Sequence, residues 1–106
     1  MDREKMEKVT AAVAGGLQKL GCSAKRTGTV SLLSCAAAAA AQQLEGAAWC
    51  PHRLAHAYGE KHGKTMWCVW TAMDRALKAA GVGLPVGKAI RWLALRAVKE
   101  VESDVC

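Results

Sequence analysis

The chain has 106 residues, a length typical of one domain, and 52% of them are apolar although none is phenylalanine. No apolar run approaches the roughly 18 residues that a membrane span needs, and residues 1–9 are charged where a secretory signal would be apolar. Length and composition exclude a membrane-spanning bundle, so we expect a single cytoplasmic domain, residues 1–106, with no membrane partner.

The formal net charge of +6 is concentrated in one part of the chain. Between Gly46 and Lys99 there are nine Lys or Arg residues and two acidic residues, whereas the rest of the chain carries six basic and seven acidic residues. A basic block of this kind suits a polyanionic partner such as double-stranded DNA, although basic surfaces also serve solubility.

Five cysteines, at positions 22, 35, 50, 68 and 106, are odd in number and form no CxxC pair. We expect reduced thiols that are mostly buried as small apolar side chains. His52 and His56 are spaced as a zinc pair on one helix face, and Cys50 and Cys68 flank them, but the spacing fits no zinc finger. We therefore expect no metal and no cofactor.

Helix-forming residues dominate, and no segment alternates apolar and polar residues over the length of a strand, so we predict an all-α fold of about five helices. The first helix ends at Gly21, and Gly15-Gly16 marks either a weak spot or a close approach of another helix. Its buried stripe comprises Met6, Val9, Val13, Leu17 and Leu20. The second helix begins near Thr29 and ends at Glu45-Gly46. Its buried face comprises Val30, Leu33, Ala37, Ala40 and Leu44.

Residues 51–80 are expected to form two helices joined by a short polar break. Pro51 suits the first turn of the first helix. We expect Gly59 to cap that helix at its C-terminus and Thr65 to cap the next helix at its N-terminus. The side chains that the first helix buries are Leu54, Ala55 and Tyr58.

The second helix of this pair has two contrasting sides. The buried side comprises Val69, Ala72, Met73, Ala76, Leu77 and Ala80. The outward side comprises Lys64, Trp67, Thr71, Asp74, Arg75 and Lys78. A short helix, a tight turn and a second helix with a mostly basic outer side form the outline of a helix-turn-helix DNA reader. The alternative is an ordinary antiparallel helix pair with a solvated outer face.

A last helix is predicted from Gly87 or Lys88 to about Val101, after the loop that follows Gly81. Its inward residues are Ile90, Leu93, Ala94, Ala97 and Val98, and its outward residues are Lys88, Arg91, Arg96 and Lys99. Trp92 is expected to be half-buried beside the inward stripe, and residues 102–106 are expected to fray.

No catalytic constellation is present in the sequence: there is no GxSxG, no P-loop, no HExxH and no carboxylate pair in a plausible cleft, so we expect no enzyme. Trp49 and Trp92 are expected in the core or at its rim, and Trp70 at the edge of the buried stripe. Trp67 falls near the middle of the outward side. There it can pack on a sugar or a thymine methyl group, dock a protein partner, or fold back over the turn.

The order of these features resembles the C-terminal DNA-binding domain of the master sporulation response regulator of endospore-forming Firmicutes. The similarity covers about residues 13–98. It is carried by LQKLG at 17–21, AKRTG at 24–28, PHRLAHAYG at 51–59, Thr65, VWTAMDRAL at 69–77 and PVGK at 85–88. The framework matches best, with identities at Val69, Ala72 and Ala76. The family's outward glutamate, arginines and histidine are replaced here by Cys68, Trp70, Thr71, Asp74 and Arg75.

This resemblance implies a divergent, stand-alone, sequence-specific regulator of transcription whose second hairpin helix enters the major groove of DNA. Domains of this kind often bind as pairs, so a homodimer on DNA is a further expectation, although no residue specifies its surface. The alternative is a helical protein-interaction module that keeps the fold without specific DNA binding, which Trp67, Trp70 and Asp74 favour and the basic block opposes.

The predicted DNA contacts divide by role. Base edges face Trp67, Cys68, Thr71 and Arg75, and phosphates at the start of the helix meet His62, Lys64 and Thr65. The backbone is gripped by His52, Arg53 and Lys61, with further phosphate contacts from Lys78, Lys88 and Arg91. Asp74 opposes phosphate binding unless it pairs with Lys78 four residues later or accepts a hydrogen bond from a cytosine amino group.

Overall fold

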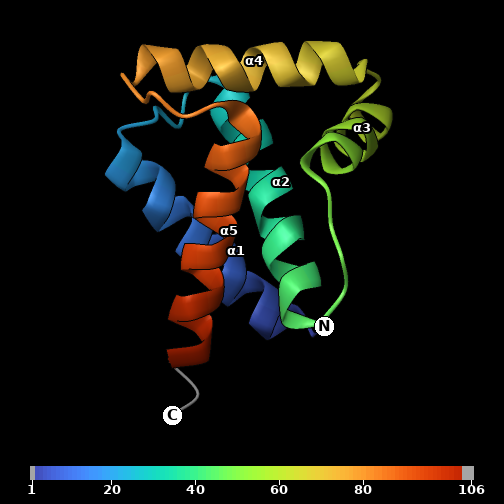
Figure 1. Cartoon of the computed structure of the whole chain (residues 1–106), viewed down its shortest axis with the longest axis vertical. Helices are drawn as coiled ribbons and strands as arrows, with labels where there is room; N and C mark the ends of the chain where they lie inside the picture. Colours follow the sequence, from blue (N-terminus) through green and yellow to red (C-terminus); the bar gives the residue numbers. More distant parts are fainter. Residues whose placement is uncertain (1, 104–106) are drawn as a thin grey trace.

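Five helices make up the described part of the chain, residues 2–103, in this computed structural model (Figure 1). They are α1 (Arg3–Leu20), α2 (Thr27–Leu44), α3 (Pro51–His62), α4 (Met66–Ala79) and α5 (Val86–Ser103). The prediction of an all-α fold of about five helices is confirmed, since residues 2–103 contain no strand.

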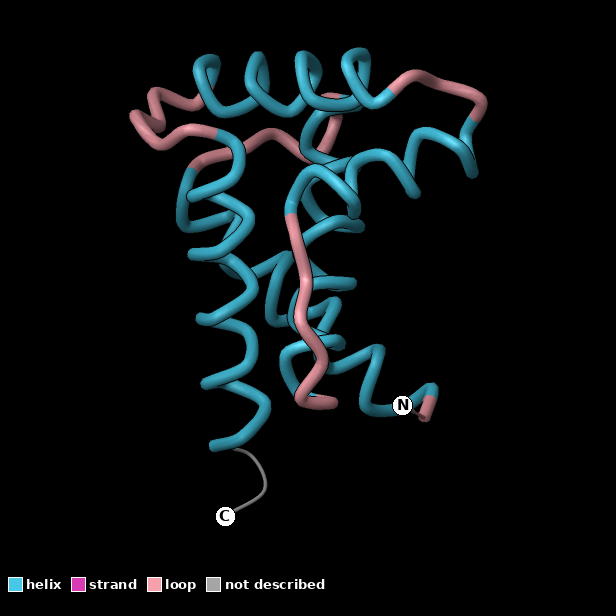
Figure 2. Tube along the Cα trace, turned by 45° about the vertical axis from the view of Figure 1, so that its right-hand side comes forward, coloured by secondary structure: helices cyan, strands magenta, loops and turns pink. Residues whose placement is uncertain are grey.

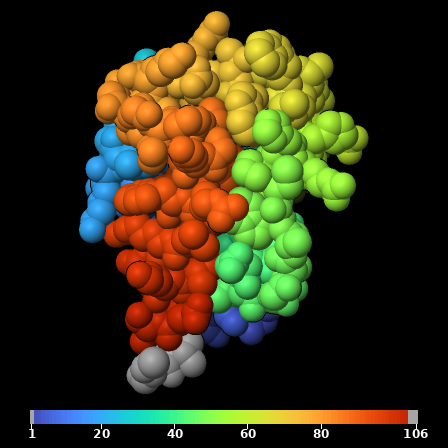
Figure 3. Space-filling view, viewed as in Figure 1, coloured from blue at the N-terminus to red at the C-terminus, as the bar shows by residue number. Residues whose placement is uncertain are grey.

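Helix α2 is the centre of the arrangement, because it packs against each of the other four helices. In Figure 1, α2 and α5 run along the long axis of the molecule, and α4 lies across their end. The segment of residues 45–50 runs back along α2 and delivers the chain to α3 beside that same end (Figure 2). This path leaves α4 as the outermost layer at one end of the molecule (Figure 3).

The predicted apolar stripes of α1, α4 and α5 form the core. Helix α1 buries Val9, Val13 and Leu17; α4 buries Val69, Met73, Ala76 and Leu77. Helix α5 contributes the longest stripe, namely Val86, Ala89, Ile90, Leu93, Ala94, Ala97, Val98 and Val101. These helices have one strongly apolar side each, which is why their periodicity predicted the core.

The predicted buried face of α2 was partly wrong. Val30 is 46% exposed, and the fully buried positions include Leu32 and Cys35, which the predicted stripe omitted. Helix α2 is enclosed by four neighbours and is apolar almost all round, so its sequence carries no single stripe to identify. It also begins at Thr27, two residues before the predicted start.

The glycine that ends α3 is Gly63, not Gly59. Helix α3 continues to His62, and Gly63 takes a left-handed conformation with φ of 67°. Gly59 is buried inside the helix, where a Cβ atom would lie 2.5 Å from the carbonyl oxygen of Lys64. Glycine is needed at position 59 because the returning turn passes directly over it. The other predicted cap is confirmed: Thr65 Oγ1 accepts a hydrogen bond from the backbone N–H of Cys68, at 3.1 Å.

Arg96 does not face out as predicted. Gly16 leaves a gap on α1, and Leu93, Trp92 and Arg96 all lie within 4 Å of the place where its Cβ would be. The Arg96 guanidinium lies 5.8 Å from the centre of the Trp92 ring, and its Nη1 atom is buried. The expected close approach of another helix to the Gly15-Gly16 pair is therefore confirmed at Gly16. At the C-terminal end, Glu102 and Ser103 are helical rather than frayed, and residues 104–106 lie outside the described residues.

Most of the cysteines are less buried than predicted. Only Cys35 among the four described cysteines is buried, because it lies in the middle of α2. Cys22 and Cys50 lie at the edges of loops and are partly exposed, and Cys68 is exposed on α4. Cys106 lies outside the described residues.

Gly28 fixes the contact between α2 and α4. A Cβ atom at Gly28 would clash with the carbonyl group of Ala72 in the middle of α4, and would also touch Ala76. Backbone atoms cannot move aside as a flexible side chain can. Glycine at this position therefore lets the first turn of α2 lie directly against the backbone of α4.

We predict that Gly28→Ala lowers the free energy of unfolding by about 1–3 kcal/mol, since α4 must move away from α2 to make room. The matched control is Gly15→Ala in α1, where an added Cβ meets nothing within 4 Å. That change should be neutral or stabilise by up to about 1 kcal/mol, because alanine favours a helix interior. Urea denaturation measures both, and equal effects of the two variants would contradict the assigned contact.

Candidate nucleic-acid interface

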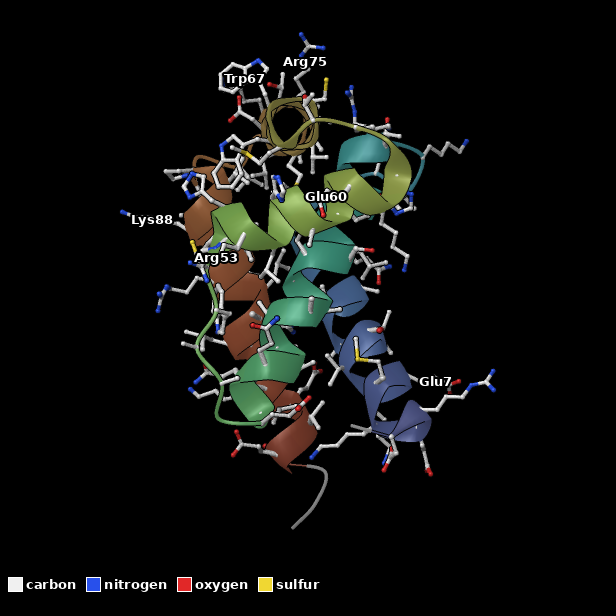
Figure 4. The ribbon with its side chains drawn as sticks, turned by 90° about the vertical axis from the view of Figure 1, so that its right-hand side faces the viewer. Glu7, Arg53, Glu60, Trp67, Arg75 and Lys88 are labelled. Atoms are coloured by element: carbon white, nitrogen blue, oxygen red, sulfur yellow. The ribbon has the colours of Figure 1, made fainter. Side chains whose placement is uncertain are left out.

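Helices α3 and α4 are joined by a turn of three residues, Gly63, Lys64 and Thr65. Figure 4 looks along α4 and shows α3 from the side, so the two helices cross steeply. They do not form the flat antiparallel pair that was the structural alternative. The steep crossing places α4 above α3 with its outer side facing away from the protein.

The outer side of α4 is open to solvent. Trp67 and Arg75 both point away from the rest of the molecule in Figure 4, and the Trp67 side chain is 73% exposed. Cys68 and Lys78 are also exposed, and Thr71 is half-buried. Trp67 therefore does not fold back over the turn. The four residues predicted to face bases, Trp67, Cys68, Thr71 and Arg75, do lie on one helix within three turns.

An ion pair changes the charge of this side of α4. Lys78 Nζ lies 2.9 Å from Asp74 Oδ2, the i,i+4 pairing that the sequence allowed. The two charges offset one another locally. Arg75 has no carboxylate partner within residues 2–103, so it supplies the net positive charge of the outer side of α4.

The remaining predicted contacts fall into two groups. Lys61, His62, Lys64 and Thr65 are exposed at the end of α3 and in the turn, directly before α4. His52 and Arg53 lie at the other end of α3. At 1.5 Å of rise per residue, Arg53 is about 12 Å from Lys61 along the helix axis. Figure 4 shows Arg53 on the flank of the molecule near Lys88, not beside Trp67 and Arg75.

The flank brings together the N-terminal turns of α3 and α5. A Cβ atom at Gly87 would lie 3.9 Å from both Pro51 and Trp70, so the two helices meet there. The Arg91 guanidinium lies 5.4 Å from the centre of the Trp49 ring, and Trp49 Nε1 donates a hydrogen bond to Gln43 Oε1 at 2.9 Å. With Arg53, Lys88 and Arg91, this flank is the second basic surface of the molecule.

The three histidines are occupied by neighbours on α3 and α4. The His52 ring stacks on Trp70 with 4.4 Å between ring centres, and His62 tilts over Tyr58 at 4.2 Å. His56 Nδ1 lies 3.7 Å from Glu60 Oε1. No three His, Cys, Asp or Glu side chains of residues 2–103 come together as metal ligands.

Cys50 is a feature that sequence reasoning missed. It lies at the N-cap position of α3, and the backbone N–H groups of Arg53 and His52 lower the pKa of its thiol from the ordinary value; the positive charge of Arg53 adds to this effect. A cysteine directly before a proline at a helix start was the available signal. In contrast, burial raises the pKa of Cys22, and it raises the pKa of Cys35 to about 11.

None of the helices in the described range 2–103 combines the length and the apolar character that a membrane crossing requires. Comparison with known protein families, with curated proteins and with solved structures finds no match to this chain.

We predict that Cys50 is alkylated by iodoacetamide at a lower pH than Cys22 or Cys35 in a Cys68→Ser, Cys106→Ser background. A lowered pKa leaves more thiolate at any pH below it, and the thiolate is the nucleophile. Peptide mass spectrometry after timed quenching gives each rate, and the same reaction in urea should bring the three rates together. Faster modification of Cys22 than of Cys50 at neutral pH in the folded protein would contradict the prediction.

Proposed function

We propose that this protein is a sequence-specific regulator of transcription that acts in the cytoplasm, without enzymatic activity, by inserting α4 into the major groove of DNA. The observation that carries the proposal is the position of α4: it is outermost, steeply crossed with α3, and has the exposed Trp67 and Arg75 on the same side as the half-buried Thr71. The kinship with the sporulation regulator's DNA-binding domain, and the pairing of two copies on DNA, belong to the same proposal.

The dimensions and chemistry of α4 support this docking. A helix with its side chains is about 10–12 Å across, and the major groove is about 12 Å wide. Arg75 can donate two hydrogen bonds to guanine O6 and N7, and the methyl groups of thymine suit Trp67 and the Thr71 methyl. Thr65 Oγ1 accepts the cap hydrogen bond from Cys68 N–H, so its hydroxyl hydrogen remains available to donate to a phosphate oxygen.

Lys61 and Lys64 would neutralise phosphates beside the start of α4. The flank formed by Arg53, Lys88 and Arg91 lies on a different side of the molecule, so it would reach phosphates farther along the duplex. The Asp74–Lys78 pair lowers the electrostatic contribution of α4 itself. Hydrogen bonds from Arg75 to a base would therefore contribute more to binding by α4 than nonspecific attraction between its charges and the DNA phosphates.

We predict that Arg75→Ala costs about 1–3 kcal/mol of binding free energy on a selected site and relaxes specificity at one base pair. Lys64→Ala should instead weaken binding to all sequences and lower the salt slope by about one, since one phosphate contact is lost. Fluorescence anisotropy titrations with labelled duplexes, selected from a random pool, measure both effects.

Lys8→Ala is the matched control, because Lys8 is an exposed lysine of α1, which carries no predicted DNA contact. Its affinity and salt slope should equal those of the unmodified protein. If Arg75→Ala and Lys64→Ala also bind as the unmodified protein does, the docking through α4 is refuted.

One observation favours a second function, a protein-interaction module. Trp67 is the most exposed of the large apolar side chains within residues 2–103, and an exposed tryptophan is a common anchor of protein interfaces. In that case the outer side of α4 would dock on a protein, and duplex DNA would not compete.

Trp67 also separates the two functions experimentally. If α4 reads DNA, replacing thymine by uracil in the selected site should weaken the unmodified protein, because the methyl contact is lost. The same replacement should have a smaller effect in Trp67→Ala, which lacks the Trp67 contact and keeps only that of the Thr71 methyl group. Absence of any salt-dependent binding to duplex DNA would favour the interaction module instead.

A further inference from the structure

Two exposed apolar side chains lie next to each other on α5. Trp92 and Leu95 are 38% and 40% exposed, and they are two of the four exposed large apolar side chains within residues 2–103. Together with Arg96, Val98 and Lys99 they line a shallow groove of about 520 Å³. In Figure 3, α5 is uncovered along the front of the molecule. The function proposed for α4 does not account for this apolar pair.

A lysine lies on each side of the apolar pair along the helix. Lys88, Trp92, Leu95 and Lys99 follow one another at intervals of four, three and four positions, and all four are exposed. At 3.6 residues per turn, these intervals place the four side chains on one stripe of α5. The same intervals separate the contact positions of a coiled coil. We call these four residues the α5 seam.

The charge of the α5 seam restricts the kind of partner. From Lys88 to Lys99, α5 carries four cationic side chains and no acidic one. The next acidic residue, Glu100, is used by Arg96, whose Nη1 atom lies 3.9 Å from Glu100 Oε2. Neither Lys88 nor Lys99 has a carboxylate partner within residues 2–103. A complementary partner therefore carries an acidic group at each end of an apolar surface.

Two other occupants complement the α5 seam less well. Two copies of the seam would bring their apolar residues together, but in either direction each lysine would face a lysine, and like charges repel. The backbone of duplex DNA offers phosphates to the lysines, but it offers no apolar surface to Trp92 and Leu95. A helix with both apolar and acidic side chains satisfies all four positions.

The Trp92 ring is held in place by its own chain. Its Cζ3 atom lies 3.6 Å from the place where a Cβ atom of Gly16 would be, and the Arg96 guanidinium lies 5.8 Å from the ring centre. A side chain that is already fixed loses little conformational entropy on binding. Trp92 therefore has the properties of the aromatic anchors that contribute most to protein interfaces.

We propose that the α5 seam binds an amphipathic helix of another protein. This helix carries two apolar side chains three positions apart, with an acidic residue four positions before the first and another four positions after the second. The apolar side chains contact Trp92 and Leu95, and the carboxylates pair with Lys88 and Lys99. This inference concerns α5 and does not require that α4 reads DNA.

The test uses two synthetic peptides built mainly from alanine and glutamine, each of about 20 residues so that a helix can form. The glutamate peptide has two leucines and two glutamates in the proposed spacing, and the lysine peptide has lysines in place of the glutamates. In ¹H–¹⁵N NMR titrations of the whole protein, the glutamate peptide should shift the amide signals of Trp92, Leu95 and Lys99 saturably. The lysine peptide should not shift them.

Single substitutions with matched controls test the two kinds of contact. Leu95→Gln and Lys99→Glu should each weaken binding of the glutamate peptide by about 3- to 10-fold, since one loses apolar contact and the other opposes a carboxylate. Val30→Gln removes a similarly exposed apolar side chain from α2, and Lys25→Glu makes the same charge change in a loop. Both controls should bind the glutamate peptide as the unmodified protein does.

Reversing the charge of the α5 seam should exchange the preferred peptide. The double variant Lys88→Glu, Lys99→Glu should bind the lysine peptide and should no longer bind the glutamate peptide. Such a gain of binding cannot result from unfolding. Circular dichroism establishes that every variant is folded before titration.

Four results would overturn the proposal. One is the absence of saturable shifts at about 1 mM glutamate peptide. Another is equal weakening by Lys25→Glu and Lys99→Glu, which would indicate general charge attraction. If duplex DNA, and not the peptide, shifts the signals of Trp92 and Leu95, the seam belongs to the DNA interface. If these signals move on dilution of the protein alone, and Leu95→Gln abolishes the change, the seam joins two copies of this chain.

Discussion

The contact between the first turn of α2 and the backbone of α4 determines how the rest of the molecule is arranged. Gly28 allows α2 to touch the Ala72 carbonyl, and Gly59 allows α3 to pass under the turn that precedes α4. Both contacts involve backbone atoms, so neither helix can shift along α4 by a rearrangement of side chains. Two glycines therefore hold α4 across the end of the bundle with one side buried and the other exposed.

This arrangement explains why the charge on α4 is lower than the sequence suggests. Because one side of α4 packs closely against the other helices, charged residues can occupy only its outer side. There the negative charge of Asp74 offsets the positive charge of Lys78. Of the other cations predicted to contact DNA, Arg75 stays unpaired on α4, Lys61 and Lys64 lie directly before α4, and Arg53 and Lys88 lie on the flank. These basic side chains lie on two different sides of the molecule, so a partner that contacts all of them must reach both sides. The phosphate backbone of a duplex can do this, because it runs along both sides of a helix that lies in a groove.

The sequence predicted the fold best where a helix has one apolar side and one polar side. The stripes of α4 and α5 alternate clearly between apolar and polar sides, and the Thr65 cap follows from a local hydrogen bond. Prediction failed for Val30 because α2 is apolar almost all round. It failed for Gly59 because Gly59 and Gly63 both satisfy the local rule for a helix C-cap. The two are distinguished only by the turn, which brings the Lys64 carbonyl so close to Gly59 that no Cβ atom fits there.

The candidate site was predictable to a similar extent. Helical spacing alone groups Trp67, Thr71 and Arg75 on one side of α4, and it allows the Asp74–Lys78 pair. Spacing cannot show that Arg53 lies with Lys88 on a different surface, because that depends on how α3 and α5 meet at Pro51 and Gly87. Nor can it reveal that Arg96 turns inward, since the gap it fills is created by Gly16 on another helix.

The early start of α2 connects the two unusual features of its first turn. Because the helix begins at Thr27, Gly28 is part of it and can lie against α4. The same start leaves Thr29 without a helical carbonyl four residues earlier and brings its side chain to a groove between α1 and α2. The turn that supports α4 on one side is thus a wall of that groove on the other.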